Sequence, residues 1–232
     1  MRTADKHILS TRPVTASLQA LANSKGVQLD ALPFIETELI DTIDVQQEIE
    51  QTALQYATIA FTSMNGVDAV TYLLNGQIPD WNIYCIGHAT RQQVEAYFGE
   101  QSISGTADDA AGLAELIIEE EATDEVIFFC GNQRRDELPL ALRGAGIDVQ
   151  EIIVYQTREL QHRVDKIYDA ILFFSPSAVN SFFRQNTLPA QTIVFAIGSS
   201  TANAVRRYCS NTIITAASPS KKELIEQAIA YF

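Results

Sequence analysis

The sequence predicts an α/β fold made of two similar doubly wound units, each with a parallel sheet of the flavodoxin-like type. Apolar runs of about five residues recur along the chain, and each is followed by a small or polar turn and an amphipathic stretch, which is typical of β-α units with parallel strands. The chain also repeats itself, because two kinds of module occur twice each. Doubly wound sheets are built from such units.

The repeat alternates between the two kinds of module. In the first kind, residues 8–37 resemble residues 127–157. In the second kind, the segment FTSMNGV at 61–67 resembles FFSPSAV at 173–179, and the segment IGHAT, which follows in the first copy, resembles IGSST in the second. The chain therefore reads first, second, first, second module.

Helices are expected between consecutive strands. Gly26 and Gly146 suit helix ends, where a residue with left-handed backbone conformation is needed. The strands are expected near residues 7–10, 27–31, 57–61, 82–86, 101–104, 124–129, 147–154, 169–174, 192–197 and 212–214.

Two further segments, residues 34–39 and 154–159, do not fit a β-α unit. Both are extended in character, partly alternating and rich in polar groups. One interpretation makes them surface loops, and the other makes them two crossing strands of an interdomain hinge. The order of the repeats does not choose between these interpretations.

The composition indicates a folded protein with buried cores, since apolar residues make up 47% and charged residues 19% of the chain. No apolar run approaches the roughly 20 residues that span a bilayer, and no signal-like stretch follows the N-terminal charges, so a cytoplasmic protein is expected. The net charge of −13 argues against nucleic acid and membrane partners. The cysteines are expected to be reduced, and Cys85 and His88 lack the second ligand pair of a metal site.

Hydroxyl groups and free backbone N–H groups dominate the turns that follow the expected strands. Ligands of open parallel sheets bind at these turns. A single Ser or Thr there is most simply an ordinary helix N-cap. Together with the positive ends of the helices, however, the turns suit a ligand with several carboxylates or phosphates. The candidate binding residues are Ser10, Arg12, Thr62, Ser63, Gly87, Thr90, Gly131, Asn132, Arg134, Ser175, Ser177, Gly198, Ser199, Ser200 and Thr201.

Several other sites are disfavoured by missing motifs. The phosphate-binding pattern G-x-x-x-x-G-K-[ST] is absent, and no G-x-G-x-x-G opens a helix, so nucleotide cofactors are not expected. No turn serine lies in G-x-S-x-G, which disfavours a hydrolase triad. Asp108 and Asp109 are interpreted as surface charge at the start of a helix rather than as paired catalytic carboxylates.

Several short segments occur in a characteristic order along the chain: STRP at 10–13, FTS at 61–63, IGHAT at 86–90, CGNQRR at 130–135, VYQT at 154–157, FFSPS at 173–177 and AIGSST at 196–201. In this order the segments resemble the uroporphyrinogen-III synthase family over essentially the whole length. The sequence departs from a common family pattern at Met64 and Asn65, where Pro followed by Arg is often found. Arg12, Arg134 and Arg135 are candidates to replace the basic contact that is lost there.

The resemblance implies a discontinuous division of the chain into two domains joined by a two-stranded linker. Domain one is residues 1–35 and 158–232, and domain two, residues 40–153, is inserted between them. The linker strands are 36–39 and 154–157. Without the resemblance, the repeats place a boundary near residue 122 between tandem domains.

For activity, the resemblance implies a cyclising hydro-lyase of tetrapyrrole biosynthesis. Its substrate is hydroxymethylbilane, a linear tetrapyrrole with eight carboxylates, and its product is uroporphyrinogen III, in which ring D is inverted. The terminal hydroxyl leaves as water, the substituted carbon of ring D attacks the resulting azafulvene, and a spirocyclic pyrrolenine rearranges. No metal or organic cofactor is used.

Tyr155, in the VYQT segment, is the candidate catalytic residue implied by the resemblance. A phenol has a reference pKa of about 10 and stays protonated at neutral pH, so it can protonate the leaving hydroxyl. The alternative is an interface tyrosine that only packs in the linker. The resemblance assigns the hydroxyl and glycine turns to substrate carboxylates or to substrate orientation.

Two other functions stay open. Two β-α domains joined by extended crossings also describe a non-catalytic, hinge-closing binding protein for small anions. A response-regulator-like duplication would need an acidic phosphoacceptor at a strand end, where this chain has Ser, Thr and Asn. A monomer is expected, because no long exposed apolar stripe is evident.

Overall fold

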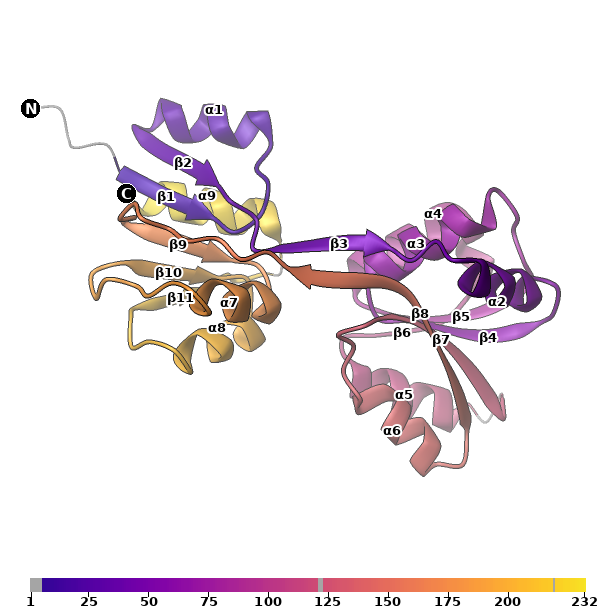
Figure 1. Cartoon of the computed structure of the whole chain (residues 1–232). Helices are drawn as coiled ribbons and strands as arrows, with labels where there is room; N and C mark the ends of the chain where they lie inside the picture. The colour runs from indigo at the N-terminus through magenta and orange to yellow at the C-terminus, as the bar shows by residue number, and fades with distance from the viewer. Residues whose placement is uncertain (1–5, 121–122, 219) are drawn as a thin grey trace, which may run out of the picture. The chain divides into compact units, whose positions relative to one another are not determined.

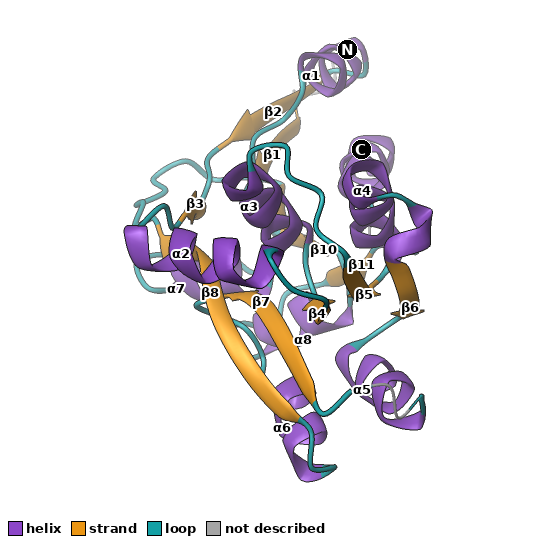
Figure 2. Ribbon diagram, turned by 90° about the vertical axis from the view of Figure 1, so that its right-hand side faces the viewer, coloured by secondary structure: helices purple, strands orange, loops and turns teal. Residues whose placement is uncertain are grey.

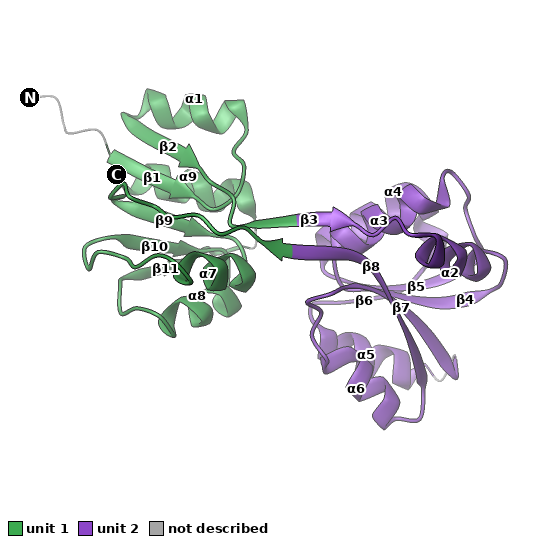
Figure 3. Cartoon of the chain, in the orientation of Figure 1, with its two compact units in different colours: residues 1–36, 158–232 green, residues 37–157 purple. Residues whose placement is uncertain are grey.

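The computed structural model describes residues 6–120, 123–218 and 220–232. The chain divides into two compact units (Figure 3), of which unit 1 comprises Met1–Glu36 and Arg158–Phe232 and unit 2 comprises Thr37–Thr157. None of the helices in the described part of the chain has the length and apolar character needed to cross a membrane.

Unit 1 is a parallel sheet with helices on both faces (Figure 1). In its described residues the strand order is β11-β10-β9-β1-β2, and the pairs are parallel. Helices α1 and α9 pack on one face and α7 and α8 on the other. The elements are β1 (Lys6–Ser10), α1 (Ala16–Ser24), β2 (Val27–Ala31), β9 (Ala170–Phe173), α7 (Pro176–Phe183), β10 (Ile193–Ala196), α8 (Ser199–Arg206), β11 (Ile213–Thr215) and α9 (Lys221–Tyr231).

Unit 2 has the same layered construction, with strand order β3-β8-β7-β4-β5-β6. Helices α2, α3 and α4 pack on one face, and α5 and α6 on the other (Figure 2). The elements are β3 (Ile35–Leu39), α2 (Ile43–Ala53), β4 (Ala57–Phe61), α3 (Met64–Leu74), β5 (Trp81–Ile86), α4 (His88–Phe98), a 3-10 turn (Glu100–Ser102), β6 (Ile103–Ala107), α5 (Ala110–Glu119), β7 (Glu125–Gly131), α6 (Glu137–Gly144) and β8 (Asp148–Glu159).

The two sheets share one arrangement of modules. In each sheet the strands of the first module are numbered 1 and 2, and those of the second module 3, 4 and 5. With this numbering both sheets have the flavodoxin-like order 2-1-3-4-5, and unit 2 has β3 as an additional edge strand. In unit 2 the second module, β4 to β6, precedes the first, β7 and β8, along the chain. The predicted doubly wound fold is therefore confirmed. The strands on either side of position 122, β6 and β7, belong to one sheet, so the structure shows no division into tandem domains there.

The two segments that do not fit a β-α unit are strands rather than surface loops. Strand β3 lies next to β8 in the sheet order, and Figure 1 draws them as arrows that run in opposite directions. The Ile40 N–H donates to the Val154 carbonyl at 3.0 Å. The Gln156 side chain donates to Glu38 Oε2 at 3.2 Å. Polar side chains are tolerated here because β3 is an edge strand whose residues stay at least partly exposed.

Local signals set the helix ends. Ser63, Asp109, Ser175 and Ser220 each accept a hydrogen bond from the backbone N–H three residues later, and each begins a helix. Gly26 and Gly146 follow α1 and α6 with φ of 73° and 86°, as predicted for helix ends that need left-handed residues.

In unit 1, Asn186 anchors the segment that leads from β8 into β9. Its side chain is 9% exposed. Its Oδ1 accepts from the Val164 N–H at 2.7 Å, and its Nδ2 donates to the carbonyls of His162 and Phe182 at 2.7 and 2.8 Å. The Phe182 carbonyl also accepts the Asn186 N–H at 3.1 Å, so two backbone groups, the Val164 N–H and the His162 carbonyl, depend on this one buried amide.

Replacing Asn186 with Ala is expected to lower the free energy of unfolding by about 2–3 kcal/mol, because the Val164 N–H and the His162 carbonyl lose their partner. Urea denaturation measures this change. Gln185→Ala is the control, since Gln185 is exposed and its side chain bonds only to Gln161 among the described residues, so it should change stability by less than about 0.5 kcal/mol. Equal losses for both variants would contradict the anchoring role.

Candidate functional site

The predicted site residues lie where strands end and helices begin. In unit 2 the carboxyl ends of β4, β5 and β6 lead into the N-termini of α3, α4 and α5, and β7 leads into the turn before α6. Parallel strands present these ends at one edge of the sheet, where the helix N-termini are partly positive. This edge of unit 2 holds Tyr155.

A β-bulge turns Tyr155 toward this edge. Strand β8 pairs Ile153 with Cys130, but it pairs Tyr155 with Gly131, so Val154 is an extra residue in β8. Consecutive residues of a regular strand point to opposite faces of the sheet. Here Val154 and Tyr155 both pack against the same apolar cluster, because the bulge breaks the alternation.

Gly131 lies directly under the Tyr155 ring. A Cβ atom at position 131 would lie 2.4 Å from two ring carbons and 2.8 Å from the phenol oxygen. No side chain fits in that space. The CGN segment therefore has a steric reason for its glycine: it lets the ring lie against the backbone of β7.

Ser63 holds the phenol oxygen. Its Oγ lies 2.9 Å from Tyr155 Oη, and either atom can be the donor. The same Oγ accepts the Gly66 N–H at 3.2 Å, which caps α3. Gly66 is buried close to the Phe129 carbonyl, so the start of α3 packs tightly on the sheet. The hydroxyl of Tyr155 is thereby tied to the positive end of a helix.

The environment keeps Tyr155 protonated. Burial raises the pKa of Tyr155 above its ordinary value, and nearby Cys130 raises it further, while the hydrogen bond from Ser63 opposes the rise. A tyrosine pKa above its ordinary value leaves the side chain a neutral phenol at physiological pH. The group can therefore donate a proton to a bound molecule.

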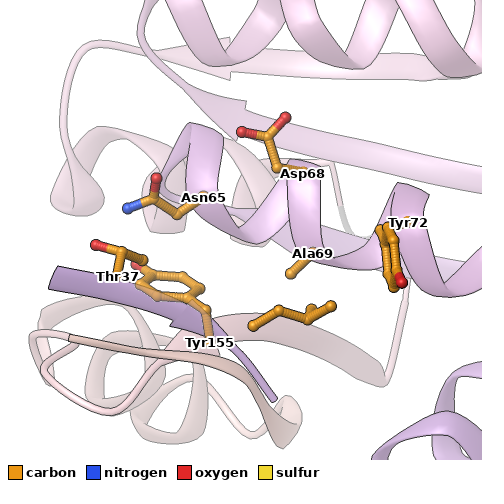
Figure 4. A pocket seen from close by; sticks show the side chains of 7 residues that line it. Thr37, Asn65, Asp68, Ala69, Tyr72 and Tyr155 are labelled. Atoms are coloured by element: carbon orange, nitrogen blue, oxygen red, sulfur yellow. The ribbon is translucent and has the colours of Figure 1, made fainter. Parts of the chain in front are cut away.

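Tyr155 lines two cavities of unit 2. The smaller cavity, of about 290 Å³, lies between Tyr155 and α3; Figure 4 shows Tyr155 across it from Asn65, Ala69 and Tyr72. The larger cavity, of about 370 Å³, has a mixed polar and apolar lining. Its lining residues are Thr62, Ser63, Ile86, Asp108, Asp109, Ala110, Phe128, Gln133, Arg134, Arg135, Glu137, Leu138 and Tyr155.

Two predicted binding residues of unit 2 already have protein partners. Arg134 forms ion pairs with Glu151 and Asp136. Asn132 Oδ1 accepts the Thr157 N–H at 2.8 Å. Both side chains therefore join the turn after β7 to strand β8, through Glu151 and Thr157.

The other predicted residues of unit 2 lie at the starts of α3 and α4. Thr62 and Ser63 line the larger cavity beside Tyr155. Gly87 precedes α4 with φ of 77°, a conformation that favours glycine. Thr90 is buried in the first turn of α4, and its hydroxyl has no hydrogen-bond partner among the described residues.

The predicted residues of unit 1 occupy the equivalent edge of the other sheet. Ser10 Oγ donates to the Arg12 carbonyl at 2.7 Å, which closes the turn after β1. Ser175 caps α7 and is followed by Ser177 in its first turn. At the start of α8, Gly198 is the N-cap and is followed by three hydroxyl residues, Ser199, Ser200 and Thr201; the first two are exposed and Thr201 is buried.

The structure adds residues that sequence reasoning missed. Asp108 and Asp109 line the larger cavity, although sequence alone favours surface charge. Asp109 also caps α5. Arg135, which the sequence already indicated as a candidate basic contact, lines the same cavity and forms no ion pair with any residue in the described ranges. Asp108 and Asp109 directly follow β6, but the expected strand ended at residue 104, so their place at this edge was not evident from the sequence. The described residues contain no cluster of three or more His, Cys, Asp or Glu side chains that could hold a metal ion.

Gly131→Ala is expected to displace the Tyr155 ring and to lower the free energy of unfolding by about 1–3 kcal/mol, because the methyl group overpacks the site. Gly144→Ala is the matched control, since a Cβ there meets nothing within 4 Å. Thermal and urea denaturation of both variants measure the difference. A fully stable Gly131→Ala protein would contradict the packing of Tyr155 on Gly131.

Comparisons with known proteins agree with this architecture. The sequence profile of the family described as uroporphyrinogen-III synthase HemD matches residues 16–226. The uroporphyrinogen-III synthase of Saccharomyces cerevisiae is 27% identical over 176 residues. That match covers 64% of this chain and 64% of the yeast protein, which is less than two thirds of its length.

Solved structures of low sequence identity share the fold. A mutant uroporphyrinogen III synthase from Thermus thermophilus matches with a TM-score of 0.71 at 14% identity, over 97% of this chain and 98% of that one. The uroporphyrinogen-III synthetase of Helicobacter pylori matches with a TM-score of 0.66 at 16% identity, over 98% of this chain and 100% of that one. Since the family profile spans most of the sequence, the chain belongs to the uroporphyrinogen-III synthase family.

Proposed function

We propose that the chain dehydrates hydroxymethylbilane and closes it, with inversion of ring D, to uroporphyrinogen III. The observation that carries the proposal is Tyr155, a neutral phenol held over Gly131 and bonded to Ser63 at a cavity, in a chain that belongs to this family. The reaction needs an acid for a hydroxyl leaving group and a surface that orders the linear substrate. Tyr155 is assigned the role of the acid, and the hydroxyl and glycine turns are assigned the role of ordering the substrate.

Tyr155 supplies the proton that the leaving group needs. The C–O bond of the terminal hydroxymethyl group breaks, the phenol proton joins the hydroxyl, and water leaves. The pyrrole nitrogen supplies electrons, which gives the cationic azafulvene. Attack by the substituted carbon of ring D forms the new C–C bond of the spirocyclic pyrrolenine. The older bond from this carbon to the bridge of ring C then breaks and is remade at the unsubstituted α-carbon of ring D, which inverts the ring. The proton released on aromatisation returns to the Tyr155 phenolate.

Ser63 directs this proton transfer. Because Ser63 Oγ accepts the Gly66 N–H, its own proton is available for the oxygen of Tyr155. In that arrangement the phenol proton points away from Ser63 and toward the substrate, and the phenolate that forms keeps a hydrogen bond. This agrees with the lowering effect of Ser63 on the pKa of Tyr155.

The hydroxyl and glycine turns bind the carboxylates of the substrate. In unit 2 these are the turns at Thr62, Gly87, Thr90 and Gly131, and in unit 1 they are the turns at Ser10, Ser175 and Gly198, with the hydroxyls that follow. Backbone N–H groups at helix N-termini are suited to carboxylates and are retained when single side chains change. Asn132 and Arg134 shape their turn through the bonds described above.

The enzyme is inferred to act as a cytoplasmic monomer without a cofactor and without a nucleic acid or membrane partner. The net charge of −13 supports the absence of polyanionic partners, because it repels them at long range. The substrate is also an anion, so local helix termini and arginines must outweigh that field. Arg135, exposed at the larger cavity, is suited to this in unit 2.

Product analysis tests the activity. Purified protein is incubated with freshly generated hydroxymethylbilane, the products are oxidised, and isomers I and III are separated beside a control without enzyme. Predominant isomer III is expected. Isomer I formed at the rate of the control would overturn the proposal and favour a non-catalytic anion-binding protein.

Tyr155→Phe is expected to lower kcat about 100-fold to 10,000-fold with little change in KM, because it removes the acid and leaves the carboxylate contacts in place. Steady-state kinetics with isomer analysis measure this. Tyr97→Phe is the control, since Tyr97 bonds to the backbone of Gly76 and Gln77 and lines neither cavity. Activity within twofold of wild type in Tyr155→Phe would show that Tyr155 only packs.

Ser63→Ala separates capping from catalysis. Ser63 and Thr42 both cap helices, so the alanine variant of each is expected to lose about 1 kcal/mol of stability. Ser63→Ala alone is expected to lower kcat about tenfold, because the pKa of Tyr155 rises further and the phenolate loses its hydrogen bond. Equal kcat values for the two variants would remove Ser63 from the mechanism.

A further inference from the structure

Two cations at one edge of the sheet in unit 1 lack carboxylate partners among the described residues, as Lys25, Arg206 and Arg207 also do elsewhere in the unit. The two at this edge are Arg12, in the turn after β1, and Lys221, the first residue of α9. Several other cations of the unit are paired with carboxylates, among them Lys6 with Asp169, Lys166 with Asp30, Arg184 with Glu159 and Lys222 with Glu226. Arg12 and Lys221 are therefore available to an external anion.

The fold brings the two cations to the same edge of the sheet. Thr11, next to Arg12, donates from both its N–H and its hydroxyl to the Leu172 carbonyl of β9, at 3.1 and 2.7 Å. Helix α9 packs its buried Leu224 and Ile225 into the cluster that contains Leu172. The turn after β1 and the start of α9 are thus both fixed at the carboxyl end of the central strands.

The positive charges of Arg12 and Lys221 also repel each other. Burial lowers the pKa of the half-buried Arg12. Partial burial lowers the pKa of Lys221, and the charge of Arg12 lowers it further. Two like charges held close together without a counterion destabilise each other. The N-terminus of α9 adds a partial positive charge at Lys221. An anion at this point would relieve the repulsion.

We propose that Arg12 and Lys221 together bind two neighbouring carboxylates on one pyrrole ring of the substrate. This inference rests on the proposed function. Eight carboxylates on four pyrrole rings place two on each ring, so one ring offers two negative charges to two positive ones. The Arg12 guanidinium suits bidentate binding of one carboxylate, and the flexible Lys221 ammonium suits the other.

The N-terminal cap of α9 is formed by Ser220 and Glu223, not by Lys221. The Ser220 side chain caps α9 by accepting the Glu223 N–H at 3.3 Å, so the helix start does not depend on Lys221. Lys221 is exposed, and its replacement should leave the fold intact. Lys222, the next residue, is the matched control because its side chain is 73% exposed and faces Glu226 instead.

Steady-state kinetics on freshly generated hydroxymethylbilane compare the wild type with Lys221→Gln, Lys222→Gln and Lys221→Glu. Lys221→Gln is expected to raise KM about tenfold, with kcat and the fraction of isomer III unchanged, because a contact made equally to substrate and transition state is lost. Lys221→Glu should raise KM further. Lys222→Gln should match the wild type within about twofold.

Two outcomes would overturn the carboxylate site while the wild type forms isomer III. One is a KM for Lys221→Gln within twofold of the wild-type value. The other is an equal rise of KM in Lys221→Gln and Lys222→Gln, which would indicate a general effect of net charge. Wild-type protein that forms no isomer III overturns the proposed function itself, and this is seen before any variant is compared.

Discussion

Tyr155 lies over Gly131 because β8 carries one residue more than its neighbour β7 at this point, and the chemistry proposed for unit 2 depends on that contact. The bulge lets adjacent residues of β8 face the same apolar cluster, and the missing Cβ of Gly131 leaves room for the ring. Ser63 then fixes the hydroxyl through a bond that joins positions 92 residues apart in the sequence. A regular β8 would turn Tyr155 to the opposite face, away from Ser63.

The same elements stabilise the fold and prepare it for an anionic ligand. Ser63, Ser175 and Ser220 satisfy backbone N–H groups at helix starts, which stabilises each helix by about 1 kcal/mol. They also leave other N–H groups of each helix start open to a ligand. The proposed binding of an octa-anion by a chain of net charge −13 therefore depends on local dipoles and a few arginines and lysines, not on the overall field.

Sequence reasoning succeeded where local patterns decide the structure. Apolar runs predicted ten strands, and the repeat predicted two doubly wound sheets. The repeat could not show which module copies share a sheet, because either pairing buries the same strands. Nor could it show that Glu151 pairs with Arg134, or that the charge of Arg12 lowers the pKa of Lys221, since both depend on how separate elements pack together. The bulge at Val154 gives no signal in the sequence, because the residues before and after it in β8, Ile153 and Tyr155, are also largely apolar.

The protonation state of Tyr155 tests the account most directly. Carbon-13 labelling of the tyrosine ring carbons, with Tyr155→Phe to assign the signal, gives the pKa of Tyr155 from an NMR titration. The account predicts a pKa above the ordinary value of 10.0, with a further rise in Ser63→Ala. A pKa at or below 10.0, or a fall in Ser63→Ala, would contradict a buried neutral phenol that Ser63 supports as the proton donor.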